Sequence, residues 1–219
     1  MEFKLQVSPS LLAADYGCLG EAAIIAESGG ASSLHLDYMD GHYVPNISFG
    51  MELIPALKKR VTIPLVSHLM ISNTEERLGD FINRRPDYII IQEDTVQNLI
   101  DLLEKIKGDG IKTGFAINPD RPLSTLYDAL HIVDYLLILS VFPGFGGQTF
   151  IEDTLVKMEE AHEFRLSHNL SYDIAVDGGV NRNTAKKILK TGVNVLIAGS
   201  AIYGMPDVKK AISDFLAIR

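Results

Sequence analysis

Apolar and polar positions alternate in blocks along the whole chain, and eight apolar blocks have the length of buried β-strands. The predicted strands cover residues 4–12, 32–40, 63–71, 87–94, 112–118, 135–144, 171–179 and 193–202. Between most of them, apolar residues recur every three or four positions, as in 95–110 and 181–192, which predicts helices. Glycine follows three of the helical patterns, in ESGG, KGDG and KTG, where a left-handed helix cap is expected.

Strands that alternate with helices over the whole chain predict βαβ units and a parallel sheet. Eight such units are the number that closes a (β/α)8 TIM barrel, and 219 residues fit one barrel. No linker-like tract or low-complexity segment divides the chain, so we predict an α/β fold with a single domain over residues 1–219. The alternative is an open doubly wound sheet, but SLLAADYG after the first predicted strand lacks the glycine-rich dinucleotide fingerprint.

The composition narrows the class of protein. The net charge of −8 argues against a nucleic acid or an anionic membrane as partner, because both attract basic surfaces. Cys18 is the only cysteine, which excludes an intrachain disulfide framework and a zinc site built from cysteines. The sequence shows no secretory signal and no apolar run of membrane-spanning length. We therefore expect a soluble, cytoplasmic protein.

Unusual polar residues stand in several predicted strands. In 32–40, His35 and Asp37 share one face of the strand while Leu34 and Leu36 take the other. We place these two, with Ser10, His68 and Asp177, late in their strands, at the rim where TIM barrels carry their chemistry. Each has an ordinary explanation, such as a packed core histidine or an aspartate that caps a turn.

Four of these residues form a plausible metal site. His35, Asp37, His68 and Asp177 offer imidazole and carboxylate ligands, which suit one divalent ion of zinc, iron, manganese or cobalt. They come from three separate strands and are expected at one rim. A common metal ion explains this better than four unrelated structural roles.

Glycine-bearing loops follow the last three predicted strands, in PGFGGQ, DGG and AGS. Glycine lets backbone amides approach an anion closely, and the helices that follow add positive partial charge. The loops after strands 7 and 8 are the usual phosphate site of these barrels. Together, a metal, two aspartates and a phosphate site predict proton abstraction beside the carbonyl of a sugar phosphate, and return of the proton to the other side would epimerise that carbon.

The residues resemble the ribulose-phosphate 3-epimerase family. The matching motifs span nearly the whole chain: SPSLLAAD, HLDYMDGHYVPNISFG, SHLM, NP, VFPGFGGQTFI, VDGGVN and NVLIAGSAIYG. The resemblance implies a TIM barrel of the pentose phosphate pathway that interconverts ribulose 5-phosphate and xylulose 5-phosphate with a bound divalent metal, often as a homo-oligomer.

The resemblance also assigns roles to residues. His35, Asp37, His68 and Asp177 match the metal ligands, and Asp37 and Asp177 match the acid/base pair. The residues that match substrate contacts are Ser10, Met39, His68, Met70, Gly144, Phe145, Gly146, Gly147, Gly178, Gly179, Gly199 and Ser200. For the two methionines, ordinary barrel packing is the stronger explanation with respect to stability, and the functional role does not exclude it.

The chain departs from the family pattern at Val66, Gln92, Asp94, Leu139 and Phe142. Val66 stands where an acidic residue would orient a metal ligand. Allulose 6-phosphate, one carbon longer, is therefore an alternative substrate.

Two other functions remain open. A sugar-phosphate binding protein would keep the pocket without the chemistry, and a Schiff-base aldolase would need a lysine late in a strand. The loop 41–50 is either a flexible lid or a static connection.

Overall fold

The computed structural model describes residues 3–218, so Met1, Glu2 and Arg219 of the predicted domain lie outside the described residues. Eight parallel strands form one sheet in the order β1-β8-β7-β6-β5-β4-β3-β2. The strands are β1 (Gln6–Pro9), β2 (Leu34–Met39), β3 (Leu65–Met70), β4 (Tyr88–Gln92), β5 (Lys112–Ile117), β6 (Tyr135–Leu139), β7 (Asp173–Asp177) and β8 (Val195–Ala198). The predicted (β/α)8 barrel is confirmed, and the open doubly wound sheet is wrong.

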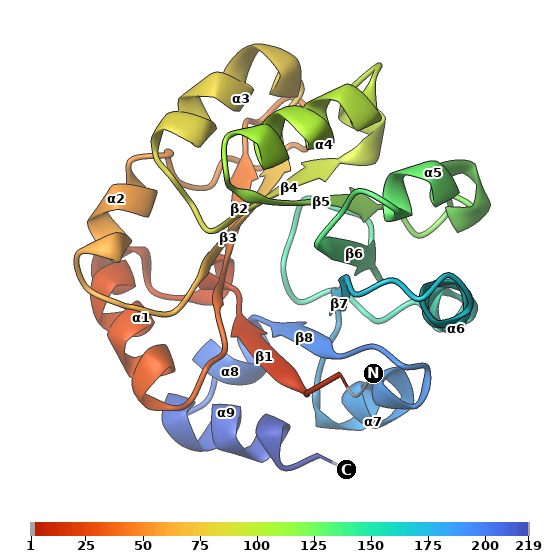
Figure 1. Ribbon diagram of the computed structural model, residues 1–219. Helices are drawn as coiled ribbons and strands as arrows, with labels where there is room; N and C mark the ends of the chain where they lie inside the picture. The colour runs from red at the N-terminus through yellow and green to blue at the C-terminus, as the bar shows by residue number, and fades with distance from the viewer. Residues whose placement is uncertain (1–2, 219) are drawn as a thin grey trace.

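The helices lie outside the ring of strands (Figure 1). They are α1 (Leu19–Ser28), α2 (Leu53–Lys58), α3 (Thr74–Asn83), α4 (Leu99–Gly108), α5 (Tyr127–Leu130), α6 (Thr154–Ser167), α7 (Arg182–Lys190), α8 (Ser200–Tyr203) and α9 (Val208–Leu216). Short 3-10 turns complete the connections: η1 (Leu11–Ala13), η2 (Tyr16–Cys18), η3 (Glu93–Thr95) and η4 (Leu123–Leu126). Among residues 3–218, none of the helices combines the length and the apolar character that crossing a bilayer requires.

The three predicted cap glycines end their helices as expected. Gly30, Gly110 and Gly192 have φ angles of 91°, 76° and 90°, in the left-handed region that glycine tolerates best. At the other end of α7, Asn181 accepts hydrogen bonds from the backbone N–H groups of Asn183 and Thr184. Local sequence signals therefore fix the limits of these helices.

Several predicted strands are longer than the observed ones. The predicted strand 193–202 splits into β8 and α8, because Gly199 leaves the extended conformation at φ −97°, ψ −91°. The first predicted strand ends at Pro9, since the Ser10 side chain accepts from the Leu12 backbone N–H and starts η1. An apolar run marks where a strand lies, but here it continues into the turn that follows.

The ring closes between β1 and β2 through few backbone contacts. A single parallel bridge joins Ser10 to His35, the Ser32 N–H donates to the Val7 carbonyl, and the Ser33 hydroxyl donates to the Ser8 hydroxyl. Strands in a barrel are staggered, so an early residue of β2 lies level with the residue that follows β1. Our placement of His35 late in its strand is therefore wrong, because it is the second residue of β2, whereas Ser10 lies at the C-terminal end of β1 as predicted, one residue beyond the strand.

Side chains alternate between the inside of the barrel and the layer below the helices. Leu34, Leu36 and Tyr38 pack in the outer core, as predicted for the apolar face of β2. The interior up to the floor of the cavity is filled by a separate apolar cluster of Val66, Ile90, Ala116, Tyr135, Leu137, Leu139, Ala175, Val195 and Ile197, of which Leu139 and Ile197 line that cavity. Because this cluster fills the barrel below them, the polar side chains that point inward on β2 and β3 are confined to the upper part of the interior.

Candidate active site

Two histidines and two aspartates converge at the top of the barrel interior. His35 and Asp37 come from β2, His68 from β3 and Asp177 from the last position of β7, and one potential ligand atom from each lies within 4.8 Å of the others. His35 Nε2 lies 3.0 Å from Asp37 Oδ1 and 3.9 Å from Asp177 Oδ2, and His68 Nδ1 lies 3.2 Å from Asp37 Oδ1. The structure thus brings together all four residues that the sequence predicted as ligands.

The chemistry of this cluster fits a divalent metal. Imidazole nitrogen and carboxylate oxygen are ligands that zinc, iron, manganese and cobalt all accept. His35 and His68 are completely buried, and only Asp177 among the four is appreciably exposed, at 24% of its side chain. Buried carboxylates need a cationic partner, and a cation among these four side chains would supply it.

The two aspartates have opposite proton affinities. Burial alone would raise the pKa of Asp37, but the charge of and the hydrogen bond from His35 hold it well below its usual range. Burial also raises the pKa of Asp177, and the neighbouring Asp37 charge adds to this, so that its pKa is about 6. Burial lowers the pKa of His35, yet Asp37 more than reverses that effect and the net shift is upward. One carboxylate is therefore kept ionised while the other holds a proton more readily.

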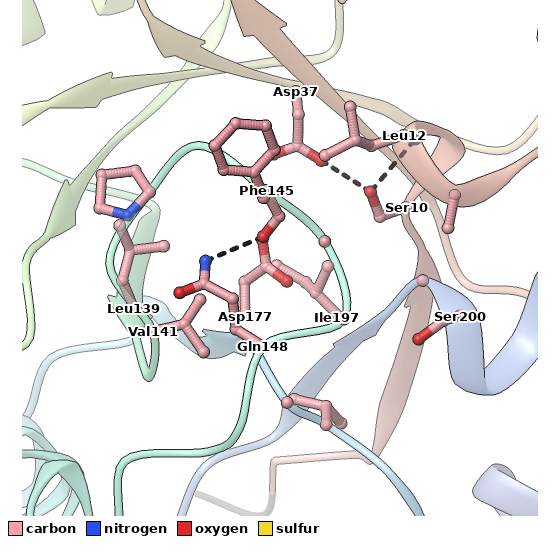
Figure 2. Close-up of a pocket in the computed structure, with 18 of the residues that line it drawn as sticks. Ser10, Leu12, Asp37, Leu139, Val141, Phe145, Gln148, Asp177, Ile197 and Ser200 are labelled. Carbon is pink, nitrogen blue, oxygen red and sulfur yellow. Dashed lines mark hydrogen bonds between the residues drawn. The ribbon is translucent and has the colours of Figure 1, made fainter. Parts of the chain in front are cut away.

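Ser10 fixes the orientation of Asp37. The Ser10 hydroxyl donates to Asp37 Oδ2 at 2.6 Å, and Ser10 Oγ accepts from the Leu12 backbone N–H at 3.3 Å (Figure 2). The Ser10 side chain therefore joins the start of η1 to the ligand cluster. This buried hydrogen bond occupies Asp37 Oδ2, whereas both histidines contact Oδ1.

A cavity of about 780 Å³ opens above the cluster, and Asp37 and Asp177 both line it (Figure 2). Among the predicted site residues, those that line it are Ser10, Asp37, Met39, Met70, Gly144, Phe145, Gly146, Gly147, Asp177, Gly178, Gly179, Gly199 and Ser200. His35 and His68 are not among the residues that line the cavity, and the predicted contact of His68 with substrate stays a prediction. Met39 and Met70 also pack against Val44, so they serve both packing and the cavity wall.

The predicted phosphate loops lie together along one wall of this cavity. Gly144, Gly147, Gly178 and Gly179 have φ angles of 133°, 76°, 110° and 61°. At Gly179 a Cβ atom would lie 2.5 Å from the Phe150 nitrogen, so this position needs glycine for space as well as for conformation. Gln148 ties the first loop together by donating to the carbonyls of Phe142 and Phe145. The backbone of these loops is thus arranged to receive an anion.

A profile described as the ribulose-phosphate 3 epimerase family matches residues 6–203. The chain belongs to this family. The ribulose-phosphate 3-epimerase of Bacillus subtilis (strain 168) is 38% identical over 213 residues, which cover 96% of this chain and 97% of the relative. That of Aquifex aeolicus (strain VF5) is 37% identical over 203 residues, covering 93% and 91%. The resemblance seen in the motifs is confirmed, and the chain is a member of an enzyme family.

Solved structures support the same architecture. A mutant tryptophan synthase α-subunit from Pyrococcus furiosus superposes with a TM-score of 0.73 at 17% identity, covering 99% of this chain and 100% of that one. At this identity the likeness shows the fold alone.

The departures from the family pattern occupy different places. Leu139 and Phe142 line the cavity, where they can affect which sugar fits. Val66 is buried in the apolar cluster of the barrel interior and pairs in register with His35, whose Nδ1 atom has no hydrogen-bond partner. Gln92 and Asp94 do not line the cavity and instead belong to a hydrogen-bond network behind His68.

Sequence reasoning missed that network as a functional feature. His68 Nε2 contacts Gln92, which contacts Asn118, which in turn contacts Asp94 and Tyr43. The residues come from four separate segments, and a single amide or tyrosine in any of them is an ordinary residue. The one available signal was the polar run QED at the end of a strand that is otherwise apolar.

The loop 41–50 is well anchored. Asp40 accepts the backbone N–H groups of His42, Tyr43 and Ser72, and the Ser48 hydroxyl donates to the Asp37 carbonyl. These contacts favour a static connection over a flexible lid. No lysine lines the cavity within the part of the chain that the structure describes, which removes the basis for the aldolase alternative.

Proposed function

We propose that this chain inverts C3 of a ketose phosphate, and that it interconverts D-ribulose 5-phosphate and D-xylulose 5-phosphate. The observation that carries the proposal is the pair of aspartates in one cavity whose pKa values are displaced in opposite directions. An epimerase needs one group to take a proton from carbon and another to give one back. Membership of the ribulose-phosphate 3-epimerase family supports the same reaction.

Asp37 and Asp177 have complementary roles in this proposal. In one direction the ionised Asp37 removes the C3 proton, and Asp177 delivers a proton to the same carbon from its own side. In the reverse direction the two residues exchange roles. Ser10 holds Asp37 in place through its hydrogen bond, so the base keeps one orientation while it waits for substrate.

The four clustered side chains would hold one divalent ion: His35, Asp37, His68 and Asp177. When bound, such an ion acts as a Lewis acid that stabilises negative charge on the substrate oxygens next to the reacting carbon. The glycine loops after β6, β7 and β8 bind the phosphate through backbone N–H groups and position C3 between the aspartates.

The experiment measures hydrogen exchange at C3. Purified protein with added metal is incubated in deuterated water with ribulose 5-phosphate and, separately, with allulose 6-phosphate. We expect deuterium at C3 and formation of xylulose 5-phosphate from the first sugar. Faster exchange with the six-carbon sugar would move the assignment to a hexulose phosphate. Thermal stabilisation by both sugars without exchange would mean that the chain is a binding protein and would refute the proposal.

A further inference from the structure

A relay of four side chains runs from the ligand cluster to the protein surface. His68 Nε2 lies 3.0 Å from Gln92 Oε1, Gln92 Nε2 lies 3.0 Å from Asn118 Oδ1, and Asn118 Nδ2 lies 2.8 Å from Asp94 Oδ2. His68 and Gln92 are completely buried and Asn118 nearly so, whereas Asp94 is exposed. We call these four residues the relay.

The exposed end of the relay dictates the direction of every hydrogen bond in it. A carboxylate only accepts, so Asn118 must turn its NH₂ group toward Asp94 and its oxygen toward Gln92. Gln92 must then donate to that oxygen and present its own oxygen to His68. An amide oxygen only accepts as well, so the His68 Nε2 atom carries a proton.

Tyr43 agrees with this direction. Its hydroxyl donates to Asp94 Oδ1 at 2.9 Å and accepts from Asn118 Nδ2 at 3.3 Å. The second N–H of Asn118 thereby finds a partner, and neither contact allows the amide to be reversed. The side chain of Asn118 has no unused orientation in this network.

The proton on Nε2 determines what the other side of the ring offers. In the neutral imidazole, Nδ1 then has a lone pair and no hydrogen. That lone pair faces Asp37 Oδ1, itself an acceptor, at 3.2 Å. Two acceptors at this distance need a positive charge close to both, and a metal ion among the four ligands meets this need.

We propose that Gln92 is a positioning residue that fixes His68 in the Nε2-protonated tautomer and so directs Nδ1 to the metal, with Asp94 setting the direction of the relay from the surface. The inference rests on the metal site of the proposed function but does not depend on the identity of the sugar. Gln92 touches neither the cavity nor the other three ligands in the described contacts, and it acts through His68 alone.

The main test compares two substitutions of Gln92. Gln92→Met keeps the length of the side chain and removes the acceptor, and we expect it to weaken zinc binding by about 10- to 100-fold. In this buried position Gln92→Glu is expected to be protonated, so it keeps an oxygen for the His68 Nε2–H and an O–H for Asn118 Oδ1, and zinc affinity should stay within about threefold of the wild type. Zinc affinity is measured by competition with a chromophoric chelator, which requires no substrate and no turnover.

The tautomer itself provides a second measurement that a merely structural role of Gln92 would not change. In ¹⁵N-labelled, zinc-loaded protein, histidine side-chain NMR should show the hydrogen of His68 on Nε2 and its Nδ1 as the bound nitrogen. Metal-free Gln92→Met should show His68 shifted toward the Nδ1-protonated tautomer, because Asp37 Oδ1 at 3.2 Å from Nδ1 is then the acceptor that faces the ring. The folded state of each variant is checked by circular dichroism and thermal unfolding.

Two positions at the outer end of the relay, exposed Asp94 and half-buried Tyr43, test the role of that end. Asp94→Asn can present either an oxygen or an NH₂ group, so it no longer imposes a direction, and we expect a smaller loss of zinc affinity together with a second His68 tautomer in the metal-free protein. Tyr43→Phe is the matched control, since it removes a hydroxyl from the same network without changing the direction, and its zinc affinity should equal that of the wild type.

The outcomes separate this inference from the proposed function. Equal zinc affinity and an unchanged His68 tautomer in wild type and Gln92→Met would overturn the inference. Loss of affinity in Gln92→Glu as large as in Gln92→Met would overturn it too, because the acceptor would not be what matters. A wild type that binds zinc but fails to exchange C3 of either sugar would refute the epimerase and leave the relay intact.

Discussion

Two regions border the cavity and are built by different means: the ligand cluster, of which Asp37 and Asp177 line the cavity, and the glycine loops. On one side, the side chains of His35, Asp37, His68 and Asp177 meet in a buried cluster, and each depends on its residue type. On the other side, the glycine loops after β6, β7 and β8 contribute to the wall, and their glycines range from buried Gly144 to exposed Gly146 and Gly147. Chemical identity therefore determines the first region, and backbone shape determines the second.

This difference predicts that substitutions in the two regions fail in different ways. Changes in the cluster should reduce the rate of the chemical step or the affinity for metal. Changes in the loops should reduce the affinity for substrate or the stability of the fold.

The largest effect is expected from Asp177→Asn. The amide cannot deliver and receive a proton as the carboxylate does, so kcat for the epimerisation should fall by about 10²- to 10⁴-fold. Asp173→Asn, at the other end of the same strand, serves as control, because an amide there can still accept from Asn194 Nδ2. Both variants are assayed for turnover and for bound metal. Turnover within a few-fold of the wild type in Asp177→Asn would contradict the acid/base role.

The metal-free protein should become less stable as the pH rises from about 4 to 8. The folded-state pKa of Asp177 is about 6, above its unfolded value of about 3.9, so its contribution to stability is complete below pH 4 and is lost as the pH rises through 6. The raised pKa of His35 acts in the same direction. For Asp177 alone, two pKa units correspond to about 3 kcal/mol.

Urea unfolding with a strong chelator at several pH values measures this effect. The slope should be smaller in Asp177→Asn, and in the wild type with zinc its sign should reverse, because a metal keeps the carboxylate ionised in the folded state and protons compete with the metal at low pH. An identical pH profile for the wild type and Asp177→Asn without metal would contradict the prediction.

In the glycine loops, Gly179→Ala should destabilise the protein by about 1–3 kcal/mol and raise the KM for the sugar phosphate. Residue 179 has a φ of 61°, and an added Cβ would lie 2.5 Å from the Phe150 nitrogen. At Gly146 a Cβ meets no atom within 4 Å, so Gly146→Ala should change the thermal unfolding temperature far less. Equal destabilisation by the two variants would show that the close approach at Gly179 is not what requires glycine.

The smallest effect is expected at Val66. The His35 Nδ1 atom is buried without a partner, and Val66 lies opposite His35 in the strand register. Val66→Asp adds an acceptor that could orient the ring, and we expect about tenfold tighter zinc binding at some cost to the stability of the metal-free protein. Val66→Asn offers the same shape without the charge, and its zinc affinity should lie between those of the wild type and Val66→Asp. Weaker zinc binding by Val66→Asp than by the wild type would refute this expectation.

The sequence predicted the barrel because alternating strands and helices leave few other arrangements. It also predicted the four ligand candidates, since His35, Asp37 and His68 interrupt apolar strands and therefore stand out. The level of each residue in the barrel could not be predicted in the same way. Ser10 and His35 become neighbours through the stagger between β1 and β2, which depends on the closure of the whole ring.

The relay escaped prediction for a related reason. Gln92, Asn118 and Asp94 are common residue types at the ends of strands, and nothing local to any of them points to His68. Their significance depends on donor and acceptor directions that exist only when the three side chains are in contact. A pattern within one helix or strand can be recognised in the sequence, whereas the donor and acceptor directions of hydrogen bonds between elements are known only from the three-dimensional structure.

The sparse pairing between β1 and β2 has a dynamic consequence. Amide hydrogens near this junction lie where the barrel has the fewest backbone restraints, so local opening of the ring should start there and hydrogen exchange should be fastest among the strands. A ligand that joins His35 to His68 and Asp177 would connect β2 with β3 and β7 and would hold the weak edge of the cylinder in place. Binding of a metal at this site should therefore slow local opening of the barrel between β1 and β2.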